Sequence, residues 1–501
     1  MEKPSDLQAE DRQVDQPAVP LPSNLPSDEA EFKALEKRLV RKVDMRLMPV
    51  LIIMIVLNYL DRNALPNARV QGLEEDLGLV GEQFNTAISV LFAGYIALQI
   101  PSNLILTRVQ PRIYLSGCMA LWGVVSGCTA LVQDFKGLVV CRFFLGVLEA
   151  PFFPGAIFLL SAWYTPRELA TRTAVLYTGS LISGGFGGLV GAGVQYGLDG
   201  ARGLESWRWL FIIEGAATVF LSLASMFILP NFPSTTSWLS EDEKTMAVYR
   251  LNRDSGSRDE ERGPILSGLK LALADYKVWL FAIIILTKTS AAAVTSFIPT
   301  LVKTLEYSRV NTLLLVAPPY VFAAIVSMAL SINSDRMQER YLHLVAPLLV
   351  GMVGYIIAAA TTTLAPRYFS LFLMLGGVYG GFNVGLAWLS STFPRPLEKR
   401  AATYALVNTV GNFAQIYSPY MYKADSGPRY LPAMGSNIGF VFVSICFATL
   451  LWFCLKRENG KLDALESDTY NDVENPKGGD EIIQAGPGGI LALNPGFRYI
   501  L

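Results

Sequence analysis

The chain has 501 residues, of which 52% are hydrophobic and only 17% are charged, with a mean hydropathy of +0.37. A soluble domain usually carries about 25% charged residues, so this composition argues against a soluble protein and is typical of one whose surface lies largely in lipid. The formal net charge is −1, with no basic domain or arm, which gives no reason to expect a nucleic-acid partner.

The first 44 residues are polar, proline-rich and charged. They contain no short apolar core of the kind that marks a cleavable signal peptide. We therefore predict that residues 1–44 form a disordered N-terminal tail and that the first hydrophobic segment serves as the membrane-insertion signal.

Twelve apolar runs follow this tail, each near the length of about 20 residues that a helix needs to cross a bilayer. They fall at residues 47–69, 84–106, 113–133, 138–161, 172–196, 208–229, 277–301, 312–332, 343–363, 368–391, 402–422 and 437–456. A polar linker of residues 231–275, with one amphipathic helix, separates the sixth run from the seventh. The pattern predicts an all-α membrane protein with twelve transmembrane helices in two six-helix repeats, residues 45–230 and 276–456, and a C-terminal tail of residues 457–501.

Lysine and arginine collect in the flank before the first helix, in the loops after even-numbered helices, in the linker and after the last helix. Cytoplasmic loops are enriched in these residues. We therefore expect both termini and the linker to be cytoplasmic, which requires an even number of helices.

The first apolar run contains two adjacent ionisable residues, Asp61 and Arg62, in the stretch NYLDRN. They lie twelve and thirteen residues beyond Pro49, which is about 18–20 Å along a helix and near the middle of a bilayer. An ionisable group there costs a few kcal/mol or more, so it normally faces a cavity or a partner. The alternative is that the helix ends at this point and the pair is solvated.

The loops after the second and the eighth helix are similar to each other. The first reads NLILTRVQPR, with Arg108 and Arg112, and the second reads SINSDRMQER, with Asp335, Arg336 and Arg340. Both resemble the signature Gly-x-x-x-Asp-Arg-x-Gly-Arg-Arg of the major facilitator superfamily, whose two six-helix halves are related by a repeat. We expect these loops to act as conformational switches. The first copy has Asn103 and Thr107 in place of the glycine and the aspartate, which counts against a charge relay there.

The fourth predicted helix, CRFFLGVLEAPFFPGAIFLL, buries Arg142 and Glu149. Seven residues are nearly two helical turns, so both side chains share one face about 10 Å apart. Direct pairing along a helix suits a spacing of three or four residues. Arg142 is therefore free to bind a substrate carboxylate and Glu149 to carry a proton, with a structural ion pair as the alternative.

Four other polar side chains within the apolar runs are candidates for substrate contact. Tyr59 and Tyr95 lie in the first and second helices, where an aromatic boundary layer is the alternative. Asn408 and Asn412 are four residues apart in the eleventh helix and share a face. They can bind an anion or bridge two helices.

Helices five to seven add a glycine-rich face and two further charges. The run from Gly179 to Gly193, GSLISGGFGGLVGAG, predicts close approach by a neighbouring helix. Glu214 in the sixth helix and Lys288 in the seventh are buried charges to which the sequence assigns no role.

Several stretches narrow the resemblance to one branch of the superfamily. NYLDR, IPSNLILTRVQPR, RFFLGVLEAPFFPG, WRWLFIIEG and GNFAQIYSPYMY are similar to segments of the anion:cation symporter family. WLSEDEK and RLNRD in the linker, and NPGFRYIL at the end, resemble its fungal allantoate and nicotinic acid permease subgroup. The resemblance covers almost the whole chain beyond the first forty residues and implies transport of small carboxylates, usually driven inward by protons.

Residue by residue, the resemblance implies that Asp61 and Glu149 take part in proton coupling and that Arg62 and Arg142 meet the substrate anion. Tyr95 falls on the tyrosine of the second helix in that family. The family's asparagine in the eleventh helix fits two positions of this chain.

We therefore expect a secondary active transporter that brings in a nicotinate- or allantoate-like organic anion with protons by alternating access. An exporter of an acidic secondary metabolite on the same fold is the rival, and a non-transporting nutrient sensor is a further alternative. With one histidine and no nucleotide, metal or Ser-His-Asp motif, we expect neither an enzyme nor a cofactor. A monomer in the plasma membrane is expected, with the vacuolar membrane as the alternative.

Overall fold

The computed structural model describes residues 22, 24–106, 109–236, 238–255, 265–393, 397–473 and 498–501. These residues form eighteen α-helices with short 3-10 turns and no strand. Ten helical stretches among them are long and apolar enough to cross a membrane. Helices α3 and α17 occupy the second and eleventh predicted runs, so the described residues contain a helix at each of the twelve predicted positions. The predicted fold class is confirmed.

The N-terminal half follows the first six predicted segments. Its helices are α1 (Glu29–Val70), α2 (Leu73–Asp76), α3 (Gln83–Leu106), α4 (Pro111–Cys128), α5 (Phe135–Glu149), α6 (Phe152–Ser161), α7 (Pro166–Leu198) and α8 (Ser206–Ile228). The fourth segment is divided where α5 ends at Glu149, because Pro151 lacks the backbone N–H that a continuous helix needs. The break places Glu149 at a helix end in the middle of a span.

The C-terminal half repeats this arrangement. Its helices are α11 (Tyr276–Ala292), α12 (Ile298–Lys303), α13 (Arg309–Met337), α14 (Tyr341–Ala360), α15 (Leu364–Gly380), α16 (Phe382–Thr392), α17 (Leu397–Tyr417) and α18 (Leu431–Val473). The tenth segment is divided at Gly381, between α15 and α16. The fourth helix of each half is therefore broken, as expected for two related repeats.

The outer surface of the helices is apolar. On α8, Phe220 is 71% exposed and Phe227 is 84% exposed, and Ile325 on α13 is 63% exposed. Soluble monomers rarely expose large contiguous apolar patches. These side chains are therefore suited to lipid.

The first helix is longer than predicted. It begins at Glu29, so the last part of the predicted disordered tail (residues 1–44) is helical, and residues 1–21 lie outside the described residues. In this stretch the helix buries Phe32, Leu39 and Val43. Spacings of seven and four residues put these side chains on one face, and the charged residues between them conceal the pattern in the sequence.

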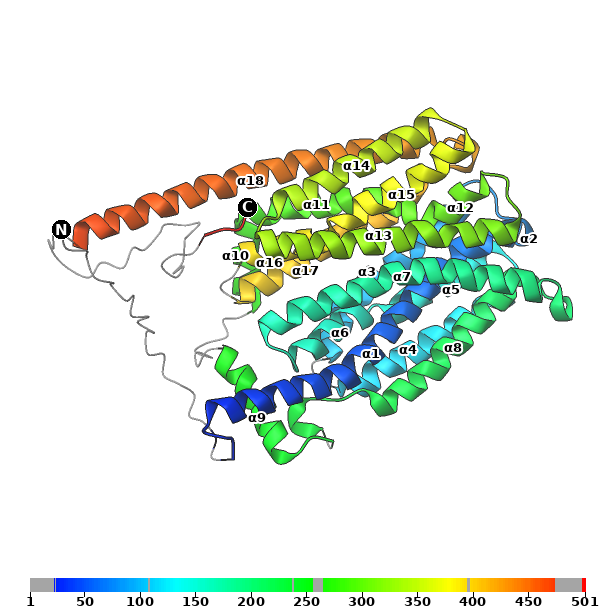
Figure 1. Ribbon diagram of the computed structural model, residues 1–501. Helices are drawn as coiled ribbons and strands as arrows, with labels where there is room; N and C mark the ends of the chain where they lie inside the picture. Colours follow the sequence, from blue (N-terminus) through cyan, green and yellow to red (C-terminus); the bar gives the residue numbers. More distant parts are fainter. Residues whose placement is uncertain are drawn as a thin grey trace.

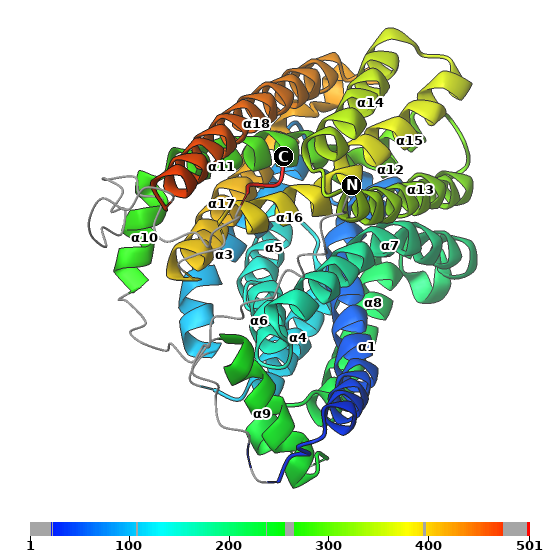
Figure 2. The same cartoon turned by 60° about the vertical axis from the view of Figure 1, so that its left-hand side comes forward.

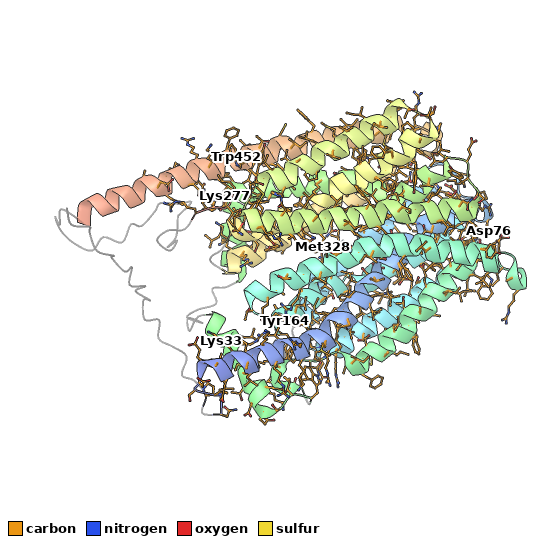
Figure 3. All side chains as sticks on the ribbon, viewed as in Figure 1. Lys33, Asp76, Tyr164, Lys277, Met328 and Trp452 are labelled. Carbon is orange, nitrogen blue, oxygen red and sulfur yellow. The ribbon has the colours of Figure 1, made fainter. Side chains whose placement is uncertain are left out.

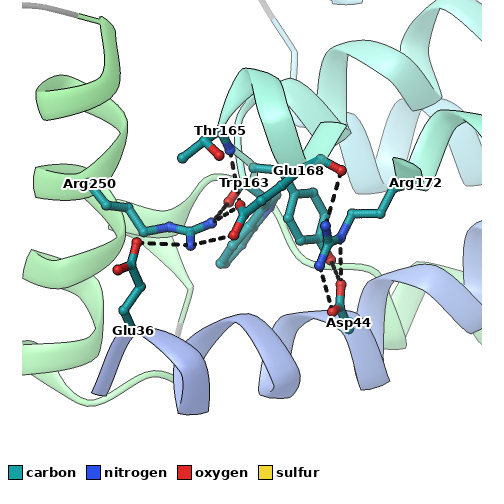
Figure 4. A network of polar contacts seen from close by, with 8 residues as sticks. Glu36, Asp44, Trp163, Thr165, Glu168, Arg172 and Arg250 are labelled. Atoms are coloured by element: carbon teal, nitrogen blue, oxygen red, sulfur yellow. Dashed lines mark hydrogen bonds and ion pairs between the residues drawn. The ribbon is translucent and has the colours of Figure 1, made fainter. Parts of the chain in front are cut away.

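The predicted linker (residues 231–275) contains two helices, α9 (Glu241–Ser255) and α10 (Ile265–Ala274), rather than one. Helix α9 is fixed to the N-terminal half by Arg250, which is 2% exposed and donates hydrogen bonds of 2.8 Å to Glu168 and to the Trp163 carbonyl (Figure 4). Beside it, Arg172 donates hydrogen bonds of 2.7 Å to both carboxylate oxygens of Asp44. The network joins α1, α7 and α9.

The helices run between two ends of the molecule. At one end, the tail face, lie α9, α10, the first turns of α1 and the last turns of α18 (Figure 1). Figure 2 brings this face forward. The opposite end, the far face, carries α2 and α12 (Figure 1). Lys33 lies toward the tail face and Asp76 at the far face (Figure 3).

Among the described residues, hydrogen bonds join the two halves only at the far face. There are five: Arg69 to Thr300 (3.4 Å), Arg309 to the Gln71 carbonyl (3.1 Å), Lys303 to Glu75 (3.4 Å), Asn85 to the Tyr422 carbonyl (3.4 Å) and Tyr420 to Thr86 (3.1 Å). We call this set the far-face clasp. The structure is therefore a conformation closed at the far face.

Helices α7 and α13, one from each half, pack closely along their length (Figure 1). A Cβ added at Gly184 would lie 2.3 Å from the Tyr320 ring, and one at Gly188 would lie 2.7 Å from the Leu313 carbonyl. Both distances are too short for any side chain. The close approach predicted from the glycine run is confirmed.

Residues 498–501 lie against the C-terminal half. Trp388 donates a hydrogen bond of 3.0 Å to the Ile500 carbonyl, and Asn459 binds both the N–H and the carbonyl of Tyr499 at 2.9 Å. Helix α18 reaches Val473, and residues 474–497 of the predicted C-terminal tail (residues 457–501) lie outside the described residues.

Candidate functional site

A buried ion pair lies where α1 meets the broken end of α5. The Arg62 Nε is 2.5 Å from the Glu149 Oε2. The Glu149 side chain is fully buried, whereas the Arg62 side chain is 16% exposed. Arg62 is therefore the member of the pair that solvent or a solute can reach.

Three aromatic rings surround the Arg62 guanidinium. Its central carbon lies 4.9 Å from the Tyr95 ring centroid, 5.3 Å from that of Tyr59 and 5.6 Å from that of Phe92. Aromatic faces attract cations at such distances. The structure thus brings Tyr59 and Tyr95, two of the predicted substrate contacts, to the same cation.

Asp61 points away from Arg62. It accepts hydrogen bonds from Ser126 (2.6 Å), Trp122 (3.1 Å) and Thr218 (3.1 Å) and is completely buried. Consecutive residues of an α-helix are about 100° apart around the axis. The adjacent side chains of Asp61 and Arg62 therefore point into different surroundings, and the acid that pairs with Arg62 comes from α5.

Arg142 lies deeper in the N-terminal half than Arg62. It is 2% exposed, and its Nε and one terminal nitrogen have no hydrogen-bond partner among the described residues. Glu214 is 3% exposed with neither carboxylate oxygen hydrogen-bonded in the same part of the chain. Arg142 interacts electrostatically with Glu149, Asp61 and Glu214. Arg142 therefore belongs to a buried charge cluster behind Arg62.

The C-terminal half contributes a cation that the sequence flagged but did not place. The Lys288 Nζ lies 4.6 Å from the centroid of the Phe382 ring, and that ring lies 4.9 Å from the Tyr177 ring of the other half. The Tyr177 hydroxyl lies within electrostatic range of those of Tyr59 and Tyr95. Lys288 therefore stands at the interface between the halves, beside aromatic rings that also approach the surroundings of Arg62.

Sequence reasoning missed four aromatic residues of this interface. Tyr177 and Phe382 meet directly, the Tyr404 hydroxyl of α17 lies within electrostatic range of Tyr177, and the Tyr379 hydroxyl of α15 lies within such range of Tyr59. The available signal was a set of tyrosines inside apolar runs, as in VLYTGS and GGVYGG. These four residues, together with Tyr59 and Tyr95, form a group that we call the central aromatic cluster.

Asn408 and Asn412 lie on α17, one and two turns beyond Tyr404. Both are half-buried. Among the described residues neither has a hydrogen-bond partner. The structure places them on a helix of the interface without bringing either to Arg62.

The two predicted switch loops differ in what they show. In the second loop, Arg340 lies 2.5 Å from Asp335 and donates a hydrogen bond of 2.9 Å to Ser334, while Arg336 is exposed. In the first loop, Arg108 lies outside the described residues and Arg112 is half-buried. The second loop is therefore held by an internal ion pair.

Comparison with known proteins gives consistent matches along the chain. The family model described as "Major Facilitator Superfamily" matches residues 51–419. "MFS-type transporter cnsO" of Penicillium expansum is 32% identical over 482 residues, covering 93% of this chain and 91% of that protein. A protein of Agrobacterium vitis named "Putative tartrate transporter" is 32% identical over 436 residues, covering 85% of this chain and 97% of that protein.

Solved structures resemble the fold at lower identity. A bacterial homologue of the human lysosomal transporter Spinster, in an inward-facing and unoccupied conformation, has a TM-score of 0.64 and 16% identity, covering 81% of this chain and 96% of that one. The Escherichia coli xylose transporter XylE, in a partially occluded inward open conformation, has a TM-score of 0.61 and 13% identity, covering 82% and 97%. At these identities the likeness concerns the fold alone.

Proposed function

This chain belongs to the major facilitator superfamily, and from that membership we propose that it carries a small organic anion into the cell together with protons. It is an integral multi-pass membrane protein and a secondary transporter, not an enzyme. The proposal concerns its substrate class, its coupling ion and its direction.

The observation that carries the proposal is the pairing of Arg62 with Glu149. An anion that binds Arg62 must compete with the Glu149 carboxylate, which lies 2.5 Å from it. A proton on Glu149 removes that competitor. Anion and proton therefore favour each other's binding, and this coupling is reciprocal.

The surroundings of Arg62 favour a carboxylate on a small, partly planar solute. A guanidinium offers a planar fork of donors that matches a carboxylate, and the central aromatic cluster supplies flat apolar walls. Nicotinate- and allantoate-like acids have this chemistry. Tartrate, named for one relative, is also a carboxylate.

We assign the other predicted residues smaller parts in proton coupling and anion binding. Asp61 is a second proton acceptor, but its hydrogen-bond partners are Ser126, Trp122 and Thr218, so a proton on Asp61 frees no cation for the anion. We therefore assign the main coupling role to Glu149. Arg142 balances the buried acids behind the site and binds the anion only if the cluster rearranges.

The far-face clasp bears on which side of the membrane is closed in the observed conformation. If both termini are cytoplasmic, as the lysine and arginine pattern predicts, the tail face is cytoplasmic and the clasp closes the outer side. The structure then corresponds to the state that releases substrate into the cytoplasm. Residence in the plasma membrane follows from the proposed uptake role.

Reconstituted vesicles test this proposal. The purified protein is assayed with labelled nicotinate and labelled tartrate under an imposed proton gradient. Symport predicts accumulation inside when the outside is acidic and none without the gradient. Accumulation only when the inside is acidic would contradict it and favour the rival exporter, which exchanges anion for proton.

A further inference from the structure

Lys288 has no assigned role in proton coupling or in binding the first carboxylate. It lies twelve residues into α11 (Tyr276–Ala292), about 18 Å from the start of the helix. It is 1% exposed, and its ammonium group has no hydrogen-bond partner among the described residues. A buried, unpaired cation in a membrane span is costly and normally faces a cavity or a partner.

No side chain of the described structure is the partner of Lys288, so the position of the ammonium group decides which ligand groups it can meet. The ammonium group lies over the Phe382 ring at 4.6 Å, and Phe382 contacts Tyr177 of the opposite half at 4.9 Å. The Tyr177 hydroxyl lies within electrostatic range of the two tyrosines that flank Arg62. Lys288 and Arg62 therefore both border the central aromatic cluster, one from each half.

We propose that Lys288 binds a second anionic group of the substrate, so that the transporter selects dicarboxylates with one carboxylate at Arg62 and the other at Lys288. The inference rests on the proposed function, which by itself requires only the first carboxylate. It assigns to the C-terminal half a binding group of its own.

The charges at the interface favour two anionic groups over one. When Glu149 is protonated, Arg62 loses the only acid that pairs with it among the described residues, and Lys288 has none. A dicarboxylate supplies a counter-charge to both cations, whereas a monocarboxylate leaves one buried cation unbalanced. Two ring contacts, of 4.6 Å and 4.9 Å, lead from Lys288 through Phe382 to Tyr177, whereas the rings around Arg62 are those of Tyr59, Phe92 and Tyr95. The two cations thus have different aromatic neighbours, and each offers a place for its own carboxylate.

A two-ended ligand also explains why each half carries a cation. Binding to Arg62 alone holds the substrate on the N-terminal half. Binding to both cations stabilises conformations in which the halves are close around the substrate, because a ligand shifts an equilibrium by its differential affinity for the two states. Dicarboxylates should therefore promote occlusion more than monocarboxylates of the same shape.

Matched pairs of acids test the inference by binding to the purified full chain. Nicotinate is compared with pyridine-2,5-dicarboxylate, and benzoate with terephthalate, at one acidic pH at which both carboxylates of the diacids are ionised. We expect the wild type to bind each diacid about tenfold more tightly than its monoacid. Lys288→Met, close in shape but uncharged, should remove this advantage and change monoacid affinity by less than about twofold. Lys288→Arg should retain it.

Equal affinity of the wild type for mono- and diacids would overturn the inference, as would equal weakening of both classes by Lys288→Met. Lys288→Met removes an unpaired buried charge, so its thermal unfolding should occur at or above the wild-type temperature, and Lys288→Arg provides a second folded variant. Failure of the proposed function has a different signature. In that case Arg62→Gln leaves anion binding intact, or wild-type vesicles show no proton-driven uptake, whatever Lys288 does.

Discussion

Replacing Glu149 with glutamine should separate anion binding from proton coupling. Glutamine keeps the size of the side chain but removes the charge that holds Arg62, so it imitates a permanently protonated Glu149. Arg62 then has no acid partner among the described residues. The variant should bind the anion tightly at every pH and lose proton-driven accumulation.

The expected size of the effect follows from the geometry. Two unit charges about 4 Å apart attract by about 4 kcal/mol at an effective dielectric constant of about 20, and the Arg62–Glu149 pair is closer than that, at 2.5 Å. Part of this attraction is recovered when the substrate carboxylate takes the place of Glu149. Coupling free energies between linked sites are about 1–3 kcal/mol. We therefore expect Glu149→Gln to raise anion affinity about tenfold at neutral pH.

Two assays measure the two consequences. Binding of labelled anion to purified protein at acidic and neutral pH gives the pH dependence, which should be steep in the wild type and flat in the variant. Reconstituted vesicles give transport. The variant should exchange labelled for unlabelled anion across the membrane but should not accumulate it under a proton gradient.

The matched control is Glu214→Gln, which makes the same chemical change at a buried acid that has no hydrogen-bond partner in the described chain. It should retain accumulation. Continued accumulation by Glu149→Gln would show that Glu149 is not the coupling acid. An unchanged pH dependence of binding in that variant would refute the competition for Arg62.

Three further predictions concern the fold and its movement. Gly184→Val places a side chain where a Cβ would already lie 2.3 Å from the Tyr320 ring, so the yield of folded protein should fall, and Tyr320→Ala in the same chain should restore part of it. Arg250→Ala breaks a buried ion-pair network and should cost about 3 kcal/mol of stability, seen as a lower melting temperature with unchanged anion affinity. Thr86→Cys and Tyr420→Cys, joined by a short bis-methanethiosulfonate reagent that spans the space left by the Tyr420 ring, whose oxygen lies 3.1 Å from that of Thr86, should hold the far face closed and stop transport until the link is reduced. Transport by the cross-linked protein would contradict the role of the clasp.

The spans were predictable because lipid demands long apolar runs, and these can be read from composition alone. The ends of the helices were less predictable. The first sixteen residues of α1, from Glu29, are mostly charged and contact α9. No apolar run in the sequence indicates this part of the helix. The interruption at Pro151 had a visible cause, but a proline within an apolar run can kink a helix as well as end it.

The site was predictable in its members but not in its pairing. The sequence identified Arg62 and Glu149 as buried charges, yet their contact depends on how α1 packs against α5, which residue spacing within one helix does not encode. That Asp61 points elsewhere could have been inferred, since neighbours on a helix diverge by about 100°. The contact of Lys288 with Phe382, and of Phe382 with Tyr177, joins three helices and leaves no periodic signal.

The Arg62–Glu149 pair sums to zero charge. An empty carrier that reorients with this pair intact moves no net charge of the pair through the electric field of the membrane. Each uncompensated unit charge would gain or lose about 2.3 kcal/mol per 100 mV of membrane potential. The pair itself should therefore add nothing to the voltage dependence of the empty carrier's return, and any such dependence must come from an unpaired charge such as Lys288.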